Sequence, residues 1–406
     1  MKNGDLTQKF QQVCRAAQQV DIARQWTHPL YRYPASMSPR IARALVCALT
    51  EPGDTVLDPF CGGGTTAIEA LAHGRLAVCS DLNNLACLIT RSKAQPLTRR
   101  EIDYLKEWLQ CVALPSVVSR RIPAIPLVTN DGGAYAPRTH GLLMRLSDAS
   151  ERISTRKLRR VAQLMILRAG QVCFDCCQKR LAPSVLLDAF KRSASDVLQK
   201  LESYSQRCGE VEVAKREGRR LRVLCTDAKT LPSRLRTRAR SISCVITSPP
   251  YPGVHVLYHR WQFRGRKEIE LPYSIAGLSN GAPESHYTLG PRHEKGQTSY
   301  FGRLQRIFAK LNEALLRGTI VAQVVAFSHP SSQLRKYLAE MEAAGFEEVT
   351  VSGKGQPLVR RSVPNRRWYI RTGSTVSRKC EYVLLHRSTG GGTGRSATAT
   401  GIRSTR

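Results

Sequence analysis

Thr55-Val-Leu-Asp-Pro-Phe-Cys-Gly-Gly-Gly-Thr-Thr66 is the stretch that decides the fold. A short apolar run from Thr55 ends at the carboxylate of Asp58, and three glycines follow before a helical pattern that stops at Gly74. This is the strand, glycine-rich turn and helix that open a doubly wound nucleotide-binding sheet. Glycine is needed in such a turn because a Cβ atom would keep a ligand away from the backbone. Alone, the turn is a weak signal.

The rest of the chain supplies further strands for the same sheet. Most are short apolar runs separated by helical patterns, as expected for parallel strands joined by helical crossovers. We therefore predict an α/β fold with a doubly wound, mostly parallel, Rossmann-like sheet of seven strands and a largely helical insertion. Besides the first strand, the expected strands are Leu76–Asp81, Leu221–Asp227, Arg240–Thr247, Thr319–Val325, Phe346–Val351 and Cys380–Leu385.

Four regions are expected along the 406 residues. Residues 1–98 hold an N-terminal segment and the cofactor-binding half of the core. Residues 99–220 form the insertion, with helical patterns at Glu101–Val112, Leu158–Val172 and Val185–Tyr204. Residues 221–388 form the catalytic half, and 389–406 are a Gly/Ser/Thr-rich tail expected to be disordered.

The charge balance favours a polyanionic partner. Lys and Arg total 63 against 31 Asp and Glu, a net charge of +32 with a pI near 10.2. Nucleic acid is the simplest such partner, and a solvated basic surface is the ordinary alternative.

The N-terminus has no apolar signal core, and no run of apolar residues is long enough to span a bilayer. The 13 cysteines form no regular framework, so we expect a cytoplasmic protein without membrane segments. Cys173-Phe-Asp-Cys-Cys177 has no second Cys or His pair at metal-ligand spacing, and no metal is expected.

Informative residues follow four of the strands. Asp58, Asp81 and Asp227 end three of them, and Ser248-Pro-Pro-Tyr251 follows a fourth. Ligands of open parallel sheets bind outside the carboxyl ends of the strands, so these residues should meet in one crevice. Asp81 suits ribose hydroxyls, with a helix cap as its structural alternative, and Asp227 suits the exocyclic amine of adenine. With the backbone of Gly62–Gly64 facing an amino-acid end, the set fits S-adenosylmethionine. A P-loop is excluded because no GK[ST] follows the glycines, whereas NAD stays possible on the turn alone.

Asp58-Pro-Phe-Cys-Gly-Gly-Gly-Thr-Thr66 together with Thr247-Ser-Pro-Pro-Tyr251 resembles the amino-group DNA methyltransferases, over most of residues 28–387. In that family the first motif lines the S-adenosylmethionine site and the second is catalytic. Tyr33-Pro-Ala-Ser-Met-Ser-Pro39 resembles the segment that closes over the methionine part of the cofactor. The resemblance thus implies catalytic residues Ser248, Pro249, Pro250 and Tyr251, and cofactor-binding residues Asp58, Pro59, Phe60, Gly62, Gly64, Thr65, Asp81, Asp227 and Tyr33.

The serine form of the catalytic motif is typical of cytosine-N4 enzymes, which favours DNA as partner and cytosine N4 as target. The cofactor motif precedes the catalytic one by about 180 residues, an order that weakens a base assignment from the serine alone. Adenine N6 in DNA, guanosine N2 in RNA, and a non-enzymatic basic nucleic-acid-binding protein stay open as alternatives. A restriction endonuclease partner is possible in this family.

The catalytic turn has a physical rationale. The lone pair of an exocyclic base amine is conjugated, so the amine is a poor nucleophile. Hydrogen bonds from it to the Ser248 hydroxyl and the Pro249 carbonyl would favour tetrahedral geometry, and Tyr251 would stack on a base that has been flipped out of a duplex. Proline suits a rigid turn that aims a carbonyl.

Target recognition has two candidate regions, the Arg-rich insertion and the aromatic, basic stretch from Tyr258 to Lys295. The alternative for the insertion is a helical brace on the sheet. Four arginines of a later loop are expected at phosphates: Arg360, Arg361, Arg366 and Arg367.

Overall fold

The computed structural model describes most of the chain. The described residues are 3–19, 25–32, 36–113, 127–128, 134–135, 137–175, 181–211, 220–235, 239, 241–252, 261–263, 267–279, 294–327, 329–350, 355–362 and 380–390. Tyr33, Tyr258, Cys176 and Cys177 lie outside them, as do Arg366, Arg367 and all of the tail beyond residue 390.

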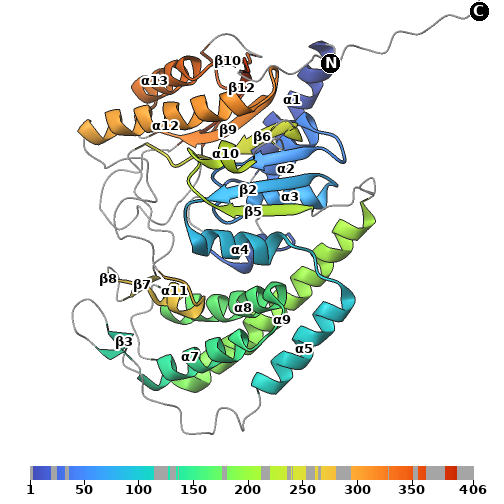
Figure 1. Ribbon diagram of the computed structural model, residues 1–406, viewed down its shortest axis with the longest axis vertical. Coiled ribbons are helices and arrows are strands. Elements are labelled where there is room, and N and C mark those ends of the chain that lie inside the picture. The colour runs from blue at the N-terminus through green and yellow to red at the C-terminus, as the bar shows by residue number, and fades with distance from the viewer. Residues whose placement is uncertain are drawn as a thin grey trace, which may run out of the picture.

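One sheet runs through the upper half of the molecule (Figure 1). Its order is β10-β12-β9-β6-β1-β2-β5, and β11 pairs with β12 beside this path. All pairings from β9 to β5 are parallel, whereas β12 is antiparallel to each of its neighbours. The strands are β1 (Thr55–Asp58), β2 (Leu76–Asp81), β5 (Leu221–Cys225), β6 (Cys244–Thr247), β9 (Ile320–Ala326), β10 (Phe346–Glu348), β11 (Val359–Ser362) and β12 (Cys380–Ser388). The prediction of a doubly wound, mostly parallel sheet is confirmed, but the described residues place eight strands in it where seven were predicted, because β11 adds to the edge of β12.

Alternate residues of the central strands enter two different cores, because successive side chains of a strand point to opposite faces. Val56 and Ile246 pack with helices α1, α2 and α3 on one face. Leu57 and Val245 pack with α10, α12 and α13 on the other. Figure 1 shows these two helical layers on either side of the strands. Their bounds are α1 (Asn3–Gln18), α2 (Pro39–Leu49), α3 (Thr65–Ala72), α10 (Leu231–Leu235), α12 (Glu294–Ala314) and α13 (Pro330–Ala343), with the 3-10 turn η1 (His28–Leu30) before α2.

A second body, the helical unit, lies below the sheet in Figure 1. It contains α5 (Arg99–Val112), α7 (Pro137–Glu151), α8 (Arg156–Phe174), α9 (Pro183–Glu210) and α11 (Leu271–Ile275), with two short ladders, β3 (Leu127–Val128) with β4 (Ala134–Tyr135) and β7 (Trp261–Phe263) with β8 (Lys267–Ile269). Helix α4 (Asn84–Ala94) lies between the two bodies, since Cys87 packs with the sheet core and Leu88 with the core of the helical unit.

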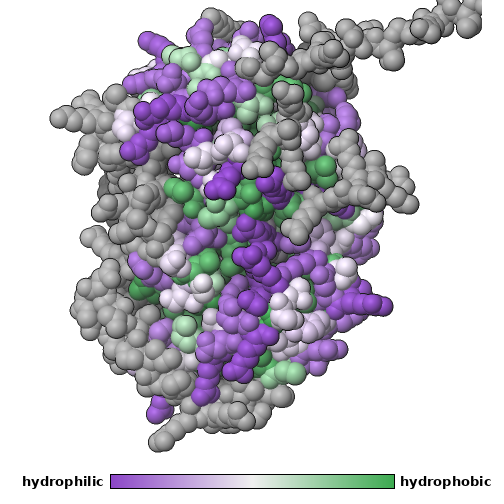
Figure 2. Space-filling view, in the orientation of Figure 1, coloured by the Kyte–Doolittle hydropathy of each residue, from purple (hydrophilic) through white to green (hydrophobic). Residues whose placement is uncertain are grey.

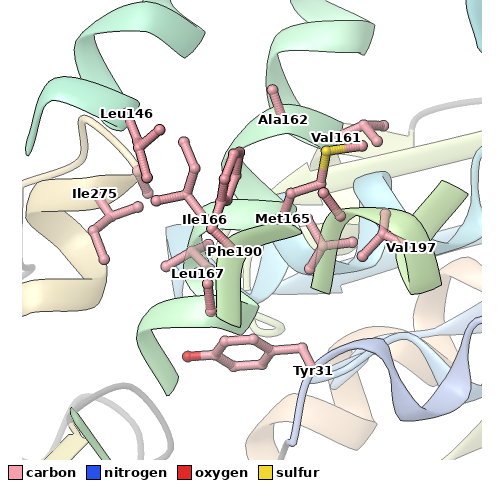
Figure 3. Packing of buried hydrophobic residues seen from close by; sticks show 14 of the residues in the cluster. Tyr31, Leu146, Val161, Ala162, Met165, Ile166, Leu167, Phe190, Val197 and Ile275 are labelled. Carbon is pink, nitrogen blue, oxygen red and sulfur yellow. The ribbon is translucent and has the colours of Figure 1, made fainter. Parts of the chain in front are cut away.

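The core of the helical unit draws on three distant parts of the chain. Met165 and Phe190 come from the insertion, Tyr31 from before the glycine turn, and Ile275 from beyond the catalytic turn. Figure 3 shows these four side chains within one packed cluster. The two candidate recognition regions therefore share a core: Trp261 stacks on Phe174 of α8 with ring centroids 6.4 Å apart and an 8° angle between the planes.

Some elements differ from the sequence-based expectation. Helix α7, which begins at Pro137, has no counterpart among the helical patterns predicted for the insertion. Pro fits the first turn of a helix as well as a loop, so this proline gave no sign of a helix start. Strand β11 forms within the stretch expected to be a basic loop. In β11, Arg361 donates from Nη2 to Glu381 at 2.6 Å, so that cation is already paired.

Hydrophilic side chains predominate on the face of the molecule shown in Figure 2. Within the described ranges, no helix is both long and apolar enough to cross a membrane. Nor do the described His, Cys, Asp and Glu residues include a group of three or more placed to hold a metal ion.

Candidate active site

The glycine turn and the catalytic turn meet where β1 and β6 pair. Strand order reverses there, since β2 and β5 continue on one side of this pair and β9 on the other. Thr247 Oγ1 donates a hydrogen bond of 2.6 Å to Asp58 Oδ1, and Phe60 N donates to the same oxygen at 3.1 Å. Asp58 thus links the end of β1 to the residue that precedes Ser248. A reversal of this kind is the usual ligand crevice of an open α/β sheet.

Asp58 is a buried carboxylate, with 3% of its surface exposed. Burial raises its pKa to about 6, against the lowering effect of hydrogen bonds from Thr247 and Thr66. The group therefore holds the two turns together at a cost, because the charged form has lost its hydration.

The glycine turn has a backbone that other residues rarely adopt. Gly62 has φ 47° and Gly64 has φ 81°, both in the left-handed region. A Cβ on Gly64 would also lie 2.9 Å from the Thr90 hydroxyl. That hydroxyl donates to the Gly62 carbonyl at 2.9 Å, so α4 supports the turn from behind.

Asp81 lies beside the turn, as the sequence predicts. Its Oδ2 accepts from Gly62 N and its Oδ1 from Asn83 N, each at 2.9 Å. Burial raises the pKa of this carboxyl, and the backbone donors oppose the shift. The sequence left two roles open for Asp81, a ligand for ribose hydroxyls and a helix cap. In the structure its carboxylate already accepts from the glycine turn at Gly62 and from the start of the next helix at Asn83. Each carboxylate oxygen can accept more than one hydrogen bond, so capacity for ribose hydroxyls is left.

Asp227 follows a residue that is bonded to Asp81, because Thr226 N donates to the Asp81 carbonyl at 3.0 Å. The Asp227 side chain is exposed and accepts from Lys229 N at 2.8 Å. Four strand ends thus form one continuous row through the contacts of Asp58, Gly62 and Asp81.

The catalytic turn is anchored to β9. Ser248 Oγ donates to the Val324 carbonyl at 2.9 Å, and Tyr251 Oη lies 3.2 Å from the same Oγ. A serine hydroxyl has a single hydrogen, and here it points to Val324. Ser248 therefore acts as an acceptor on its other side, where Tyr251 now donates. Tyr251 is 6% exposed. A second anchor comes from α12, where Tyr300 Oη donates to the Pro250 carbonyl at 2.7 Å.

Lys93 supports the glycine turn and has no counterpart among the sequence-predicted residues. It is 3% exposed, and its Nζ donates to the Gly63 carbonyl at 3.0 Å and to the His28 carbonyl at 3.2 Å. Burial lowers its pKa to about 7, and the nearby charge of Arg168 acts in the same direction. Among the described residues its hydrogen-bond partners are backbone carbonyls, which do not neutralise an ammonium charge, so its burial is costly.

Residues 29–32 precede Tyr33 and are held by α8. Arg168 Nη1 donates to the Pro29 carbonyl at 2.8 Å. Gln171 accepts from Arg32 N at 2.9 Å and donates to the Arg32 carbonyl at 3.0 Å. Trp261 Nε1 donates to Tyr31 Oη at 3.1 Å. The helical unit thus fixes the start of the segment that was predicted to cover the cofactor, while Tyr33 itself lies outside the described residues.

Residues 6–92 match the family model described as DNA methylase, the N6/N4 methylases. The match spans residues 6–92 of the 406-residue chain. The methylase match includes α2, the glycine turn and Asp81, and it implies S-adenosylmethionine as the methyl donor.

Curated relatives align over short stretches of this chain. The Type II methyltransferase M.MvaI of Kocuria varians is 33% identical over 78 residues, which are 18% of this chain and 17% of that protein. Two relatives are tRNA (guanine(10)-N2)-dimethyltransferases. That of Methanothermobacter thermautotrophicus is 44% identical over 15% of this chain and 18% of its own length. That of Methanocaldococcus jannaschii is 36% identical over 20% of this chain and 25% of its own length.

Among solved structures, TrmN from Thermus thermophilus matches 87% of this chain and half of its own length, at 13% identity and a TM-score of 0.33. A TM-score this low does not establish a common fold. The doubly wound arrangement rests on the sheet order of this chain itself.

The residues at the crevice fit S-adenosylmethionine. The glycine turn leaves backbone uncovered by side chains at Gly62, and acceptors for hydroxyl and amine groups are present at Asp81 and Asp227. Carboxylates also suit a ligand that carries a positive sulfonium. Pro59, Phe60 and Thr65 lie along the same turn, with Phe60 half-buried and the other two buried.

Proposed function

We propose that this chain is an S-adenosylmethionine-dependent methyltransferase that acts on an exocyclic amine of a nucleic-acid base, with N4 of cytosine in DNA as the favoured target. The observation that carries the proposal is the contact between the two motifs, Thr247 Oγ1 to Asp58 Oδ1 at 2.6 Å. It brings the turn expected to bind the base against the turn expected to bind the cofactor.

The residues of this chain would bind and orient the amine. Ser248 Oγ keeps its hydrogen on Val324 and offers a lone pair, so it can accept one amine hydrogen. The amine would take the place at Ser248 that the Tyr251 hydroxyl now holds. The Pro249 carbonyl would accept the second hydrogen, and the two bonds together would reduce conjugation of the nitrogen lone pair with the ring. When bound, S-adenosylmethionine supplies an electrophilic methyl group.

The cofactor would be held by the row of residues along the strand ends. Asp81 would accept from ribose hydroxyls, and Asp227 from the adenine amine. Gly62, Gly64 and Thr65 would line the amino-acid end, with Tyr33 closing over it. Asp58 would act indirectly, through Phe60 and Thr247.

DNA is the preferred substrate because the methylase match is to DNA methylases and M.MvaI is a Type II methyltransferase. The relatives named as tRNA (guanine(10)-N2)-dimethyltransferases support a second candidate, N2 of guanosine in RNA. Adenine N6 in DNA is the third, since the matched family includes both amine types.

The test uses the full chain with labelled S-adenosylmethionine and separate pools of DNA and RNA. Digestion and mass spectrometry of nucleosides should give N4-methylcytosine from DNA. N6-methyladenine would move the assignment to adenine, and N2-methylguanosine from RNA alone would replace DNA by RNA. Cofactor binding without label in either pool would refute the proposed function.

A further inference from the structure

Tyr300 is a buried tyrosine on α12 whose hydroxyl contacts the catalytic turn from 50 residues away. Its Oη donates to the Pro250 carbonyl at 2.7 Å, and the residue is 2% exposed. The ring belongs to the hydrophobic core on that face of the sheet and makes an edge contact with Phe301, with centroids 5.1 Å apart. No motif in the sequence marks this position.

The catalytic turn needs outside support because of its own composition. Pro249 and Pro250 have no backbone N–H, so neither can donate a hydrogen bond that would hold the turn. The proline rings fix φ at both positions, which leaves ψ as the soft backbone angle. Each ψ sets the direction of that residue's carbonyl. The hydrogen bond from Tyr300 fixes the carbonyl of Pro250 and thereby ψ at that residue.

The other end of the turn is fixed by side chains. Thr247 is bonded to Asp58, and Ser248 to the Val324 carbonyl. With Tyr300 on the far side, the Pro249 carbonyl lies between two anchored residues. The direction of the Pro249 carbonyl is then restricted, although Pro249 has no N–H with which to form a hydrogen bond of its own.

We propose that Tyr300 is a positioning residue for methyl transfer, which holds the Pro250 carbonyl so that the Pro249 carbonyl and the Ser248 hydroxyl face one amine. The inference rests on the proposed function, because it assigns Tyr300 a part in presenting the base. Tyr300 would touch neither the base nor the cofactor.

A neighbouring tyrosine shows that burial in this core does not itself require a bonded hydroxyl. Tyr337 on α13 belongs to the same hydrophobic cluster and is fully buried. Its hydroxyl has no hydrogen-bond partner among the described residues. Burial raises the pKa of Tyr300, so its hydroxyl keeps its proton and remains a donor across the working pH range. The two tyrosines therefore form a matched pair that differs in the bond to the turn.

The experiment compares Tyr300→Phe with Tyr337→Phe in the full chain. Each change removes one hydroxyl and keeps the ring. Tyr300→Phe should lower kcat on the order of tenfold, the loss expected for one hydrogen bond that orients a reacting group. KM for the nucleic acid and the affinity for S-adenosylhomocysteine, measured by calorimetry, should stay within about twofold. Tyr337→Phe should leave kcat unchanged.

A second variant separates the hydrogen bond from general packing. Incorporation of 4-aminophenylalanine at position 300 restores a donor on the same ring and should recover most of the lost kcat. The inference is overturned if the amino variant is as slow as Tyr300→Phe, if both Phe variants lose kcat equally, or if Tyr300→Phe retains full kcat. A wild-type chain that binds S-adenosylhomocysteine but methylates no nucleic acid would instead count against the proposed function.

Discussion

Replacing Lys93 by methionine should change how the stability of the protein depends on pH. The Lys93 ammonium is buried against the carbonyls of Gly63 and His28, and its pKa is lowered from 10.5 to about 7. Above pH 7 the folded protein has therefore released a proton that the unfolded chain still holds. Unfolding takes up this proton, so the unfolding free energy rises with pH from about 7 until it levels off near the unfolded-state pKa.

The magnitude follows from the two pKa values. One proton changes the free energy by about 1.36 kcal/mol per pH unit. Lys93 is half-deprotonated in the folded state at pH 7, so its contribution should increase by about 2 kcal/mol between pH 7 and pH 9. Lys93→Met lacks the group and should show a flatter curve by this amount. Lys93→Gln, which is also neutral but keeps an amide donor for the carbonyls, should show the same flattening.

The assay is urea unfolding of wild type and variants at several pH values in this interval. Cys225 also titrates there, since a hydrogen bond with Cys87 lowers its pKa to about 7, but its effect cancels in the difference between wild type and variant. Lys106→Met is the control, because Lys106 is 40% exposed and pairs with Glu202. If the unfolding free energies of wild type and Lys93→Met changed with pH in parallel, the reasoning that a buried, titrating amine at Lys93 supports the glycine turn would be refuted.

Three further outcomes are expected. Ser248→Ala and Tyr251→Ala should each abolish methyl transfer to nucleic acid and leave calorimetric binding of S-adenosylhomocysteine intact; full activity in both would contradict the role of the turn. Asp58→Asn should raise thermal stability at pH 7, because burial raises the pKa of Asp58 from 3.8 to about 6 and ionisation of the folded protein at pH 7 costs about 3 kcal/mol. The wild-type protein has this stability in full below about pH 4, where Asp58 is protonated, and loses it as pH rises through about 6, so the gain from Asn should vanish near pH 4. An equal gain at pH 4 and pH 7 would contradict a raised pKa at Asp58. Gln171→Ala should weaken S-adenosylhomocysteine binding several-fold, because it removes the two hydrogen bonds that hold the Arg32 backbone. Gln206→Ala, at an exposed glutamine elsewhere, should not. Equal affinities in the two variants would show that α8 does not contribute to cofactor binding.

The sheet could be predicted from the sequence because its signals are local. The run Thr55–Leu57 is β-branched and the run Leu76–Cys79 is apolar, both are bounded by turn residues, and they appear within β1 and β2. Strand β11 has no such signal, because its sequence Val-Arg-Arg-Ser reads as a charged loop. It becomes a strand by pairing with the edge of β12.

The site was predictable in its motifs but not in its supports. Asp58, Asp81 and the catalytic turn stand out because glycine, proline and acidic residues follow strands at informative places. Tyr300 and Lys93 lie within ordinary helical patterns, where a tyrosine or a lysine predicts nothing specific. Their roles arise from contacts between segments that are distant along the chain, such as the bond between Tyr300 and Pro250.

The helical unit has a consequence for synthesis on the ribosome. Helices α5, α7, α8 and α9 leave the exit tunnel before Trp261. The ring of Trp261 packs on Phe174 and lies so close to Gly170 that a Cβ on this glycine would be 2.5 Å from it. Until that tryptophan and α11 arrive, part of the apolar surface of α8 has no covering partner. Nascent chains that stall short of residue 261 should therefore depend on chaperones. For the same reason, deleting residues 99–220 would expose the apolar side chains of Trp261 and α11 that pack against this core.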